Sequence, residues 1–196
     1  MAVSGAGVPA GRGTLDLKTL VAALEAAGVR YVVTGSVAAA AWMGAAETPP
    51  GDLDIVPELS RENLSRLAAF LGQCQARPVH RPDWKRTLSP EECARWRPQP
   101  ATAQQLDHQL ETPWGLLDVV PEISGAFAHL VLRAAPADAW GIEVRIAHPE
   151  DLIATLRPDR EEKHRRRQAG LAAARARAAA GARPAGLASL FLGLSG

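Results

Sequence analysis

The fold of this chain is decided by the stretch GDLDIVP at residues 51–57. Its apolar residues predict a β-strand, in which residues two positions apart point to the same face. Leu53 and Ile55 would then face the core, while Asp52 and Asp54 converge on the other side of the strand. Two carboxylates held this close repel each other unless a cation or a proton lies between them. Because hard divalent cations prefer oxygen ligands, the pair predicts a site for Mg²⁺ or Mn²⁺.

A strand, a Gly-Ser turn and a helix precede this stretch. Residues 30–34 predict a short buried strand, Gly35 and Ser36 follow it, and residues 37–44 predict an Ala-rich helix. Backbone N–H groups and a hydroxyl at a helix N-terminus favour a phosphate. A side chain added at Gly35 is expected to weaken phosphate binding at little cost in stability.

A third acidic residue, Asp118, lies in the apolar run GLLDVV at residues 115–120. The run predicts the second strand of a hairpin that turns at Pro113 and Trp114. An acid among apolar strand residues is not there for solubility. Three carboxylates around one or two Mg²⁺ ions, beside a phosphate site, are the equipment of two-metal phosphoryl or nucleotidyl transfer.

Taken together, these motifs resemble the nucleotidyltransferase fold of polymerase-β-like enzymes. The stretches YVVTGSVAA and GDLDIVP resemble the minimal nucleotidyltransferases of bacterial toxin–antitoxin systems, the AbiEii/MenA-like group, and the likeness covers about residues 17–156. The resemblance implies an α/β fold with a mixed sheet flanked by helices, and a C-terminal helical extension. It also implies transfer of a nucleoside monophosphate from an NTP to a hydroxyl of tRNA or of a protein, and an antitoxin or toxin partner.

The same resemblance implies a role for each site residue. Gly35 and Ser36 would hold the triphosphate of the nucleotide. Asp52 and Asp54 would bind the metal ions, and Asp118 would be the third carboxylate, either as a ligand or as the base for the attacking hydroxyl.

Two basic positions of the family pattern are absent from this chain. The loop before the Asp-x-Asp stretch reads ETPP at residues 47–50, where the family has Arg or Lys, and Leu156 stands where the family has Lys. Arg157 and Lys163 are the candidates for the missing nucleotide-binding cation. Two other functions therefore stay open, a catalytically weak interaction module such as an antitoxin subunit, and an RNA-binding protein that works through its Arg-rich helix.

The sequence predicts one main domain with a terminal segment on either side. The predicted division is a disordered N-terminus over residues 1–13, a nucleotidyltransferase domain over 14–157 and a basic helical extension over 158–196. Further helices are predicted near residues 17–27, 60–71, 90–96, 127–134, 149–156 and 159–180, a strand is predicted at 141–146, and an apolar segment at 185–194 ends the chain. The Arg-rich helix is also the pattern of a solvated face, and the five histidines are expected to be structural or exposed. The Trp- and Arg-rich segment 80–97 is either a nucleotide clamp or a lid that packs its own tryptophans.

Composition limits the cellular setting. Hydrophobic residues make up 47% of the 196 residues, and the formal net charge is +1, which neither favours nor excludes nucleic acid. The two cysteines have no metal-binding spacing and suit a reducing cytoplasm as free thiols. No apolar run reaches the length of about 18 residues that a membrane helix needs. Residues 1–13 lack the features of a signal peptide, so we predict a cytoplasmic protein without a membrane partner.

Overall fold

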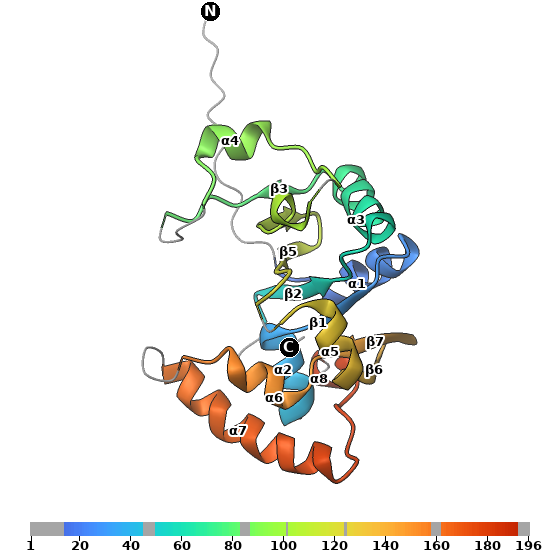
Figure 1. Cartoon of the computed structure of the whole chain (residues 1–196), viewed down its shortest axis with the longest axis vertical. Helices are drawn as coiled ribbons and strands as arrows, with labels where there is room; N and C mark the ends of the chain where they lie inside the picture. The colour runs from blue at the N-terminus through green and yellow to red at the C-terminus, as the bar shows by residue number, and fades with distance from the viewer. Residues whose placement is uncertain are drawn as a thin grey trace, which may run out of the picture.

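A computed structural model describes residues 14–44, 50–82, 87–100, 102–123, 125–157 and 162–191, with the backbone alone for Lys163 and Phe191. Within these ranges one seven-stranded sheet has the order β3-β4-β5-β2-β1-β7-β6 (Figure 1). The strands are β1 (Tyr31–Val33), β2 (Asp52–Pro57), β3 (Arg77–Pro78), β4 (Gln109–Thr112), β5 (Gly115–Val119), β6 (Ala135–Ala139) and β7 (Ile142–Ile146). The helices are α1 (Leu17–Ala26), α2 (Gly35–Met43), α3 (Arg61–Gln73), α4 (Pro90–Arg95), α5 (Phe127–Arg133), α6 (Pro149–Ala154), α7 (Glu162–Ala179) and α8 (Leu187–Phe191), with a 3₁₀ turn at Ala103–Gln105.

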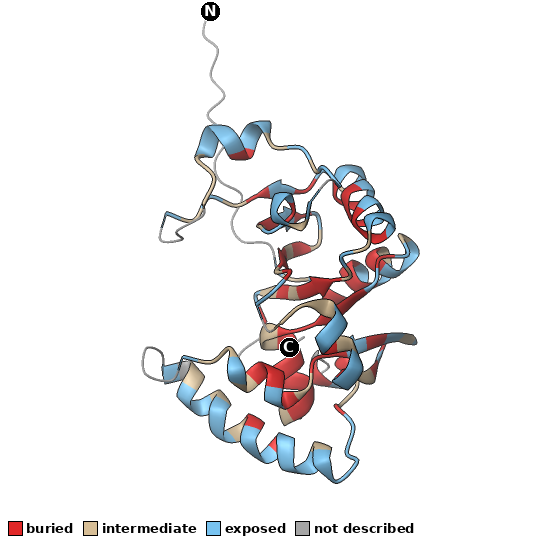
Figure 2. Ribbon diagram, viewed as in Figure 1, coloured by how far each residue is buried: buried red, intermediate tan, exposed pale blue. Residues whose placement is uncertain are grey.

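The sheet is mixed. Strand β2 is parallel to β5 and β1 is parallel to β7, while the other neighbouring pairs are antiparallel. The predicted α/β class, a mixed sheet flanked by helices with a helical C-terminal part, is confirmed. The core is formed by the apolar positions of the central strands and of the helices packed on them, as the buried residues in Figure 2 show.

Helix α3 is fixed to the two central strands by one buried side chain. Ser60 caps the helix by accepting a hydrogen bond from the backbone N–H of Asn63 at 3.3 Å. The Asn63 side chain is 1% exposed and bonds the backbone of Arg30 in both directions, at 2.7 and 2.8 Å. Its amide also donates to the carbonyl of Glu58 at 2.9 Å. The start of β1 and the end of β2 are therefore held together beneath α3.

Two strands were not predicted from the sequence. Strand β6 is poor in β-branched residues and contains Pro136, which suits an edge strand because a proline cannot donate to a further neighbour. It forms because it pairs along its whole length with β7 and because α8 packs against it. Strand β3 has only two residues, Arg77 and Pro78, and lies at the opposite edge of the sheet.

The predicted basic extension is helical and packs against the rest of the fold. In Figure 1, α7 runs beside α2 and α6, and contacts between these helices confirm that placement. Leu171 and Ala174 of α7 are buried, and Arg177 donates from its guanidinium to the carbonyl of Trp42 at 2.8 Å. The backbone N–H of Ala185 donates to the carbonyl of Ala41 at 2.8 Å, which holds the segment before α8 against α2.

Three smaller predictions concern the termini, the cysteines and the membrane. The predicted disordered segment, residues 1–13, lies outside the described residues. Cys74 and Cys93 are free thiols, as predicted. In the described part of the chain, no helix has both the length and the apolar character to cross a membrane.

Candidate active site

Three carboxylates lie on one face of the sheet, at the centre of the fold. Asp54 of β2 and Asp118 of β5 are register partners on neighbouring parallel strands. Leu53 and Leu117, one position earlier on each strand, point the other way and are fully buried. Because side chains alternate along a strand, Asp52 joins Asp54 and Asp118 on the same face, as the sequence predicts.

Burial and mutual repulsion disfavour the ionised forms of these carboxylates. The pKa of Asp54 is raised to about 6, first by burial and then by the nearby charge of Asp52. The pKa of Asp118, which is 7% exposed, is raised to about 8 by burial and by the charges of Asp54 and Asp52. Burial of like charges raises carboxylate pKa values in this way when nothing neutralises them. At neutral pH the cluster therefore favours a proton or a cation.

The Gly-Ser turn packs directly onto Asp54. Gly35 has φ +62°, and a Cβ built there would lie 1.9 Å from Oδ2 of Asp54. The backbone N–H of Ser36 donates to the Asp54 carboxylate. Only glycine fits here without strain or collision, so the expectation that a side chain at Gly35 costs little stability is wrong. The helix also begins earlier than predicted, since α2 already includes Gly35 and Ser36.

The Ser36 hydroxyl has no partner within the fold. Among the described residues, three buried side-chain oxygens lack a hydrogen-bond partner, namely Oγ of Ser36, Oδ1 of Asp118 and Oδ2 of Asp151. Two of the three therefore belong to the predicted site. Unsatisfied buried polar atoms are few in native proteins and each calls for an explanation.

A cavity of about 400 Å³ opens beside Asp52 and Asp54. It lies within the range of about 300–1,000 Å³ that is usual for small-molecule sites. Part of its lining comes from the Gly-Ser turn, and another part from α7, which contributes His164 and Arg167. The positive charge of Arg167 acts on Asp54 and opposes the increase in its pKa.

A backbone hydrogen bond selects one tautomer of the neutral His164 ring. Its Nδ1 accepts a hydrogen bond from the backbone N–H of Arg157 at 3.0 Å. In the neutral ring the proton is then on Nε2, which is a donor. Since His164 and Arg167 are three positions apart on α7, both lie on the helix face that lines the cavity.

The described structure tests one of the two cations that the sequence predicts for nucleotide binding. Arg157 has an exposed side chain that is not part of the lining, although Leu156 is. The side chain of Lys163 lies outside the described residues, as do residues 47–49 of the loop before β2. Nucleotide binding by Arg157 or Lys163 stays a prediction.

Asp118 lies outside that lining and is held from the other side by Gln109. Gln109 of β4 is 5% exposed and is the register partner of Asp118. Its amide nitrogen donates to Oδ2 of Asp52 at 3.2 Å, and its side chain also hydrogen-bonds Asp118. The guanidinium of Arg81 donates to the Gln109 carbonyl oxygen through both Nε, at 2.6 Å, and Nη2.

A metal ion would have to bind this site in a slightly different arrangement of side chains. As the described side chains stand, no group of three or more His, Cys, Asp or Glu residues is gathered so that it could hold a metal ion. One carboxylate oxygen of Asp52, Oδ2, accepts a hydrogen bond from Gln109. The chemistry of the donors nevertheless fits a hard cation, since they are carboxylate oxygens and Oδ1 of Asp118 is buried without a partner.

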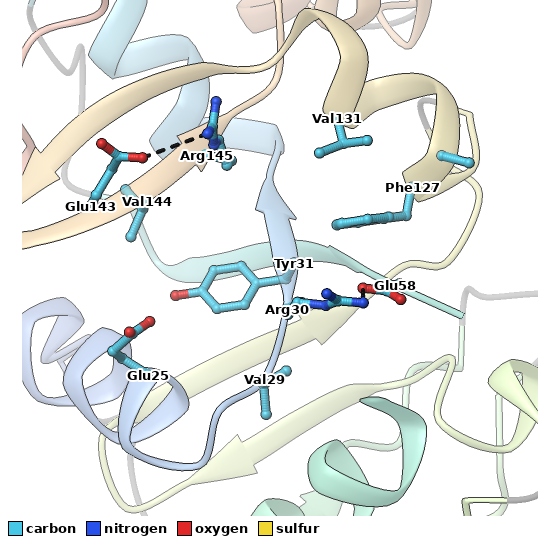
Figure 3. Close-up of a pocket in the computed structure, with 11 residues that line it drawn as sticks. Glu25, Val29, Arg30, Tyr31, Glu58, Phe127, Val131, Glu143, Val144 and Arg145 are labelled. Carbon is cyan, nitrogen blue, oxygen red and sulfur yellow. Dashed lines mark ion pairs between the residues drawn. The ribbon is translucent and has the colours of Figure 1, made fainter. Parts of the chain in front are cut away.

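A larger cavity, of about 630 Å³, lies at the other end of β1 (Figure 3). Its lining includes apolar side chains such as Phe127, together with the ion pairs Arg30–Glu58 and Arg145–Glu143. Tyr31 points into it, and burial raises the pKa of its hydroxyl above the usual range. None of the residues that line this cavity belongs to the carboxylate cluster. The candidate active site is therefore identified by its carboxylates and not by the size of the neighbouring cavity.

Four residues of the site were missed from the sequence. His164 and Arg167 belong to the helix that reads as a solvated face, and the signal was Leu171, the one large apolar residue in its middle. Gln109 could have been found by counting outward from the turn at Pro113 and Trp114, which pairs Gln109 with Asp118. No sequence signal distinguishes Arg81 from the other basic residues of its loop.

The chain is similar in fold to solved structures. No protein-family model matches it, and no curated protein matches it in sequence. A solution structure of the antibiotic-resistance factor ANT(2'')-Ia has a TM-score of 0.48 and 16% identity, over 84% of this chain and 89% of that chain. A crystal structure of ANT(2'')-Ia in complex with adenylyl-2''-tobramycin has the same TM-score and identity, over 84% of this chain and 97% of that chain. The similarity concerns the arrangement of helices and strands alone.

Proposed function

We propose that this chain is a nucleotidyltransferase that moves a nucleoside monophosphate from an NTP to a hydroxyl group. The observation that carries the proposal is the pair of buried oxygens without partners, Oγ of Ser36 and Oδ1 of Asp118. Both residues are neighbours of Asp54. Ser36 donates its backbone N–H to the Asp54 carboxylate, and Asp118 is the register partner of Asp54 on the adjacent strand. A phosphate oxygen could accept a hydrogen bond from the Ser36 hydroxyl. The reacting hydroxyl of the second substrate could donate to Oδ1 of Asp118, so that both buried oxygens would have partners.

The nucleotide would occupy the cavity between α2 and α7. Ser36 offers a hydroxyl at the start of α2, where the helix dipole favours an anion. Arg167 supplies a permanent positive charge, and Nε2–H of His164 supplies a further donor. Arg167 would replace the basic positions that are absent near residues 47 and 156.

The divalent cation, Mg²⁺ or Mn²⁺, would be held by the carboxylates of Asp52, Asp54 and Asp118. When bound, it would neutralise the negative charge that develops on the transferred phosphoryl group. The raised pKa values of Asp54 and Asp118 support this, because a cation relieves the repulsion that causes them.

Asp118 would accept the proton of the attacking hydroxyl. The acceptor oxygen forms a bond to the α-phosphorus, the bond from that phosphorus to the pyrophosphate oxygen breaks, and the hydroxyl proton passes to Oδ1 of Asp118. Arg167 and His164 would stabilise the departing pyrophosphate.

The acceptor follows from the resemblance stated above rather than from the geometry. We propose a hydroxyl of tRNA or of a protein, and a role as the toxin of a toxin–antitoxin pair in the cytoplasm. A genetic partner, either an antitoxin or a toxin, belongs to the same proposal.

Label transfer from each of the four α-³²P-labelled NTPs tests the proposal. The purified chain is incubated with Mg²⁺ or Mn²⁺ and with tRNA, cell-extract protein or an aminoglycoside as acceptor. We expect label on tRNA or protein from the wild type and from Glu111→Gln, an exposed acid of β4, but not from Asp54→Asn. Label on the aminoglycoside alone would change the acceptor class.

Two results would contradict the transferase. One is the absence of both label transfer and NTP binding in the wild type. The other is salt-sensitive RNA binding that survives in Asp54→Asn without any transfer, which would favour RNA binding through α7.

A further inference from the structure

Gln109 is a buried polar residue whose side chain contacts Asp52 and Asp118 of the carboxylate cluster and the guanidinium of Arg81. It is 5% exposed and lies on β4 directly opposite Asp118. A buried amide is costly unless its donors and acceptor are satisfied. Its NH₂ group donates to Oδ2 of Asp52 at 3.2 Å, and its side chain also hydrogen-bonds Asp118. One amide therefore bridges two of the three carboxylates.

Arg81 determines which way this amide points. A guanidinium can only donate hydrogen bonds, so it requires the carbonyl oxygen of Gln109, and the NH₂ group must then face the carboxylates. With the amide reversed, its oxygen would face Asp52 and its NH₂ group would face Arg81, and both contacts would be repulsive. The fork of Arg81 thus selects the orientation that holds Asp52.

The position of Arg81 is itself fixed by the backbone. The N–H of Val79 donates to the carbonyl of Gln109 at 2.8 Å, which extends the β3–β4 pairing toward Arg81. The N–H of Arg81 donates to Oγ1 of Thr87 at 2.8 Å, which closes the base of the loop. The Arg81 side chain is half-buried. Its positive charge acts on Asp118 and opposes the increase in the pKa of Asp118.

We propose that Gln109 is a positioning residue for the transfer reaction and that Arg81 acts through it, by limiting how far the carboxylates of Asp52 and Asp118 turn away from Asp54. The kinetic part of this inference rests on the proposed function. Neither Gln109 nor Arg81 lines the cavity between α2 and α7. Loss of either residue should therefore slow the transfer step and leave NTP binding nearly unchanged.

The kinetic test compares Arg81→Met and Gln109→Leu with the exposed Arg77→Met of β3 as control. We expect kcat to fall about 10–100-fold in the first two, the usual effect of losing a residue that orients metal-binding side chains. The KM for NTP should change less than about twofold, and Arg77→Met should behave as the wild type. Arg81→Lys, which keeps the charge but loses the fork, should recover part of kcat.

A double variant separates action through Gln109 from a separate effect of Arg81. If Arg81 works through Gln109, the variant carrying both changes loses no more kcat than Gln109→Leu alone, because coupled residues are not additive. Multiplied losses would overturn the proposal. So would wild-type kcat in Arg81→Met, which replaces a half-buried side chain and remains informative if Gln109→Leu fails to fold.

A measurement on the protein without substrate keeps the inference distinct from the proposed function. In ¹⁵N-edited NMR spectra, the Gln109 NH₂ group, assigned from its absence in Gln109→Leu, should exchange slowly with solvent in the wild type and faster in Arg81→Met. Arg77→Met should leave the exchange rate unchanged. A fast-exchanging amide in the wild type would overturn the arrangement even in an active enzyme. A protected amide in a wild type without label transfer would contradict the transferase alone.

Discussion

Asp54 on β2 and Asp118 on β5 are register partners on adjacent parallel strands. Their carboxylates leave the same face of the sheet, where neighbouring strands are only about 4.8 Å apart. The charge of Asp54 is one of the causes that raise the pKa of Asp118 to about 8. The fold therefore holds together two groups that repel each other when both are ionised, and this supports a requirement for a bound cation.

The metal-free protein should lose stability as the pH rises from about 4 to 8. The pKa of Asp118 is raised in the folded state, so over this window the folded chain binds more protons than the unfolded chain, and stability falls with increasing pH. Thermal melts in EDTA at pH 5 and pH 8 should show a smaller decrease for Asp118→Asn than for the wild type. Glu111→Gln should keep the wild-type decrease. An equal decrease in Asp118→Asn would show that this carboxylate is not the source.

Gly35→Ala should destabilise the fold and abolish nucleotide binding. The added Cβ meets the Asp54 carboxylate at 1.9 Å, and a left-handed conformation costs a non-glycine residue about 1–2 kcal/mol. Gly72→Ala is the matched control, because a Cβ there meets its nearest atom at 3.7 Å and Gly72 does not line the cavity. Melting temperature and titration with NTP check both effects. If Gly35→Ala binds NTP with wild-type affinity, the phosphate site lies elsewhere in the protein.

Arg167→Met should weaken NTP binding with little change in stability. Hydrogen bonds to charged groups contribute about 1.5–3 kcal/mol, which corresponds to an increase of about 10–150-fold in the dissociation constant. Arg175→Met on the same helix should bind normally, because Arg175 is exposed and does not line the cavity. Calorimetry with a non-hydrolysable NTP measures the difference. If the two variants bind NTP with equal affinity, α7 does not contribute to the nucleotide site.

Leu171→Ala should lower the free energy of unfolding by about 2–5 kcal/mol, as for other large buried apolar side chains. Leu132→Ala on α5 is the matched control, since Leu132 is 81% exposed and should change stability by no more than about 0.5 kcal/mol. Urea unfolding measures both variants. A neutral Leu171→Ala would mean that α7 is a separable extension, and the domain could then end near residue 157.

Much of the fold could be predicted because its local patterns agree with its tertiary structure. The alternation in residues 51–57 gives strand β2, and the polar cap at Ser60 gives helix α3. Strand β6 escaped prediction because its residues have low β-propensity, and only its pairing with β7 and the cover by α8 make it a strand. Helix α7 was predicted as a helix, but its buried face was not. That face includes Leu171 and packs against α2 and α6.

The sequence by itself determined which residues carry the carboxylates and which way they point. A side-chain period of two places Asp52 and Asp54 on one face of any strand, whatever surrounds it. Tertiary structure alone decided which groups meet them. Arg167 faces Asp54 because α7 returns more than a hundred residues later to bury Leu171, and Arg81 reaches the cluster through Gln109 because β3 pairs with β4. Such contacts depend on long-range packing, which no local period encodes, and so the cations of the site could be known only from the folded chain.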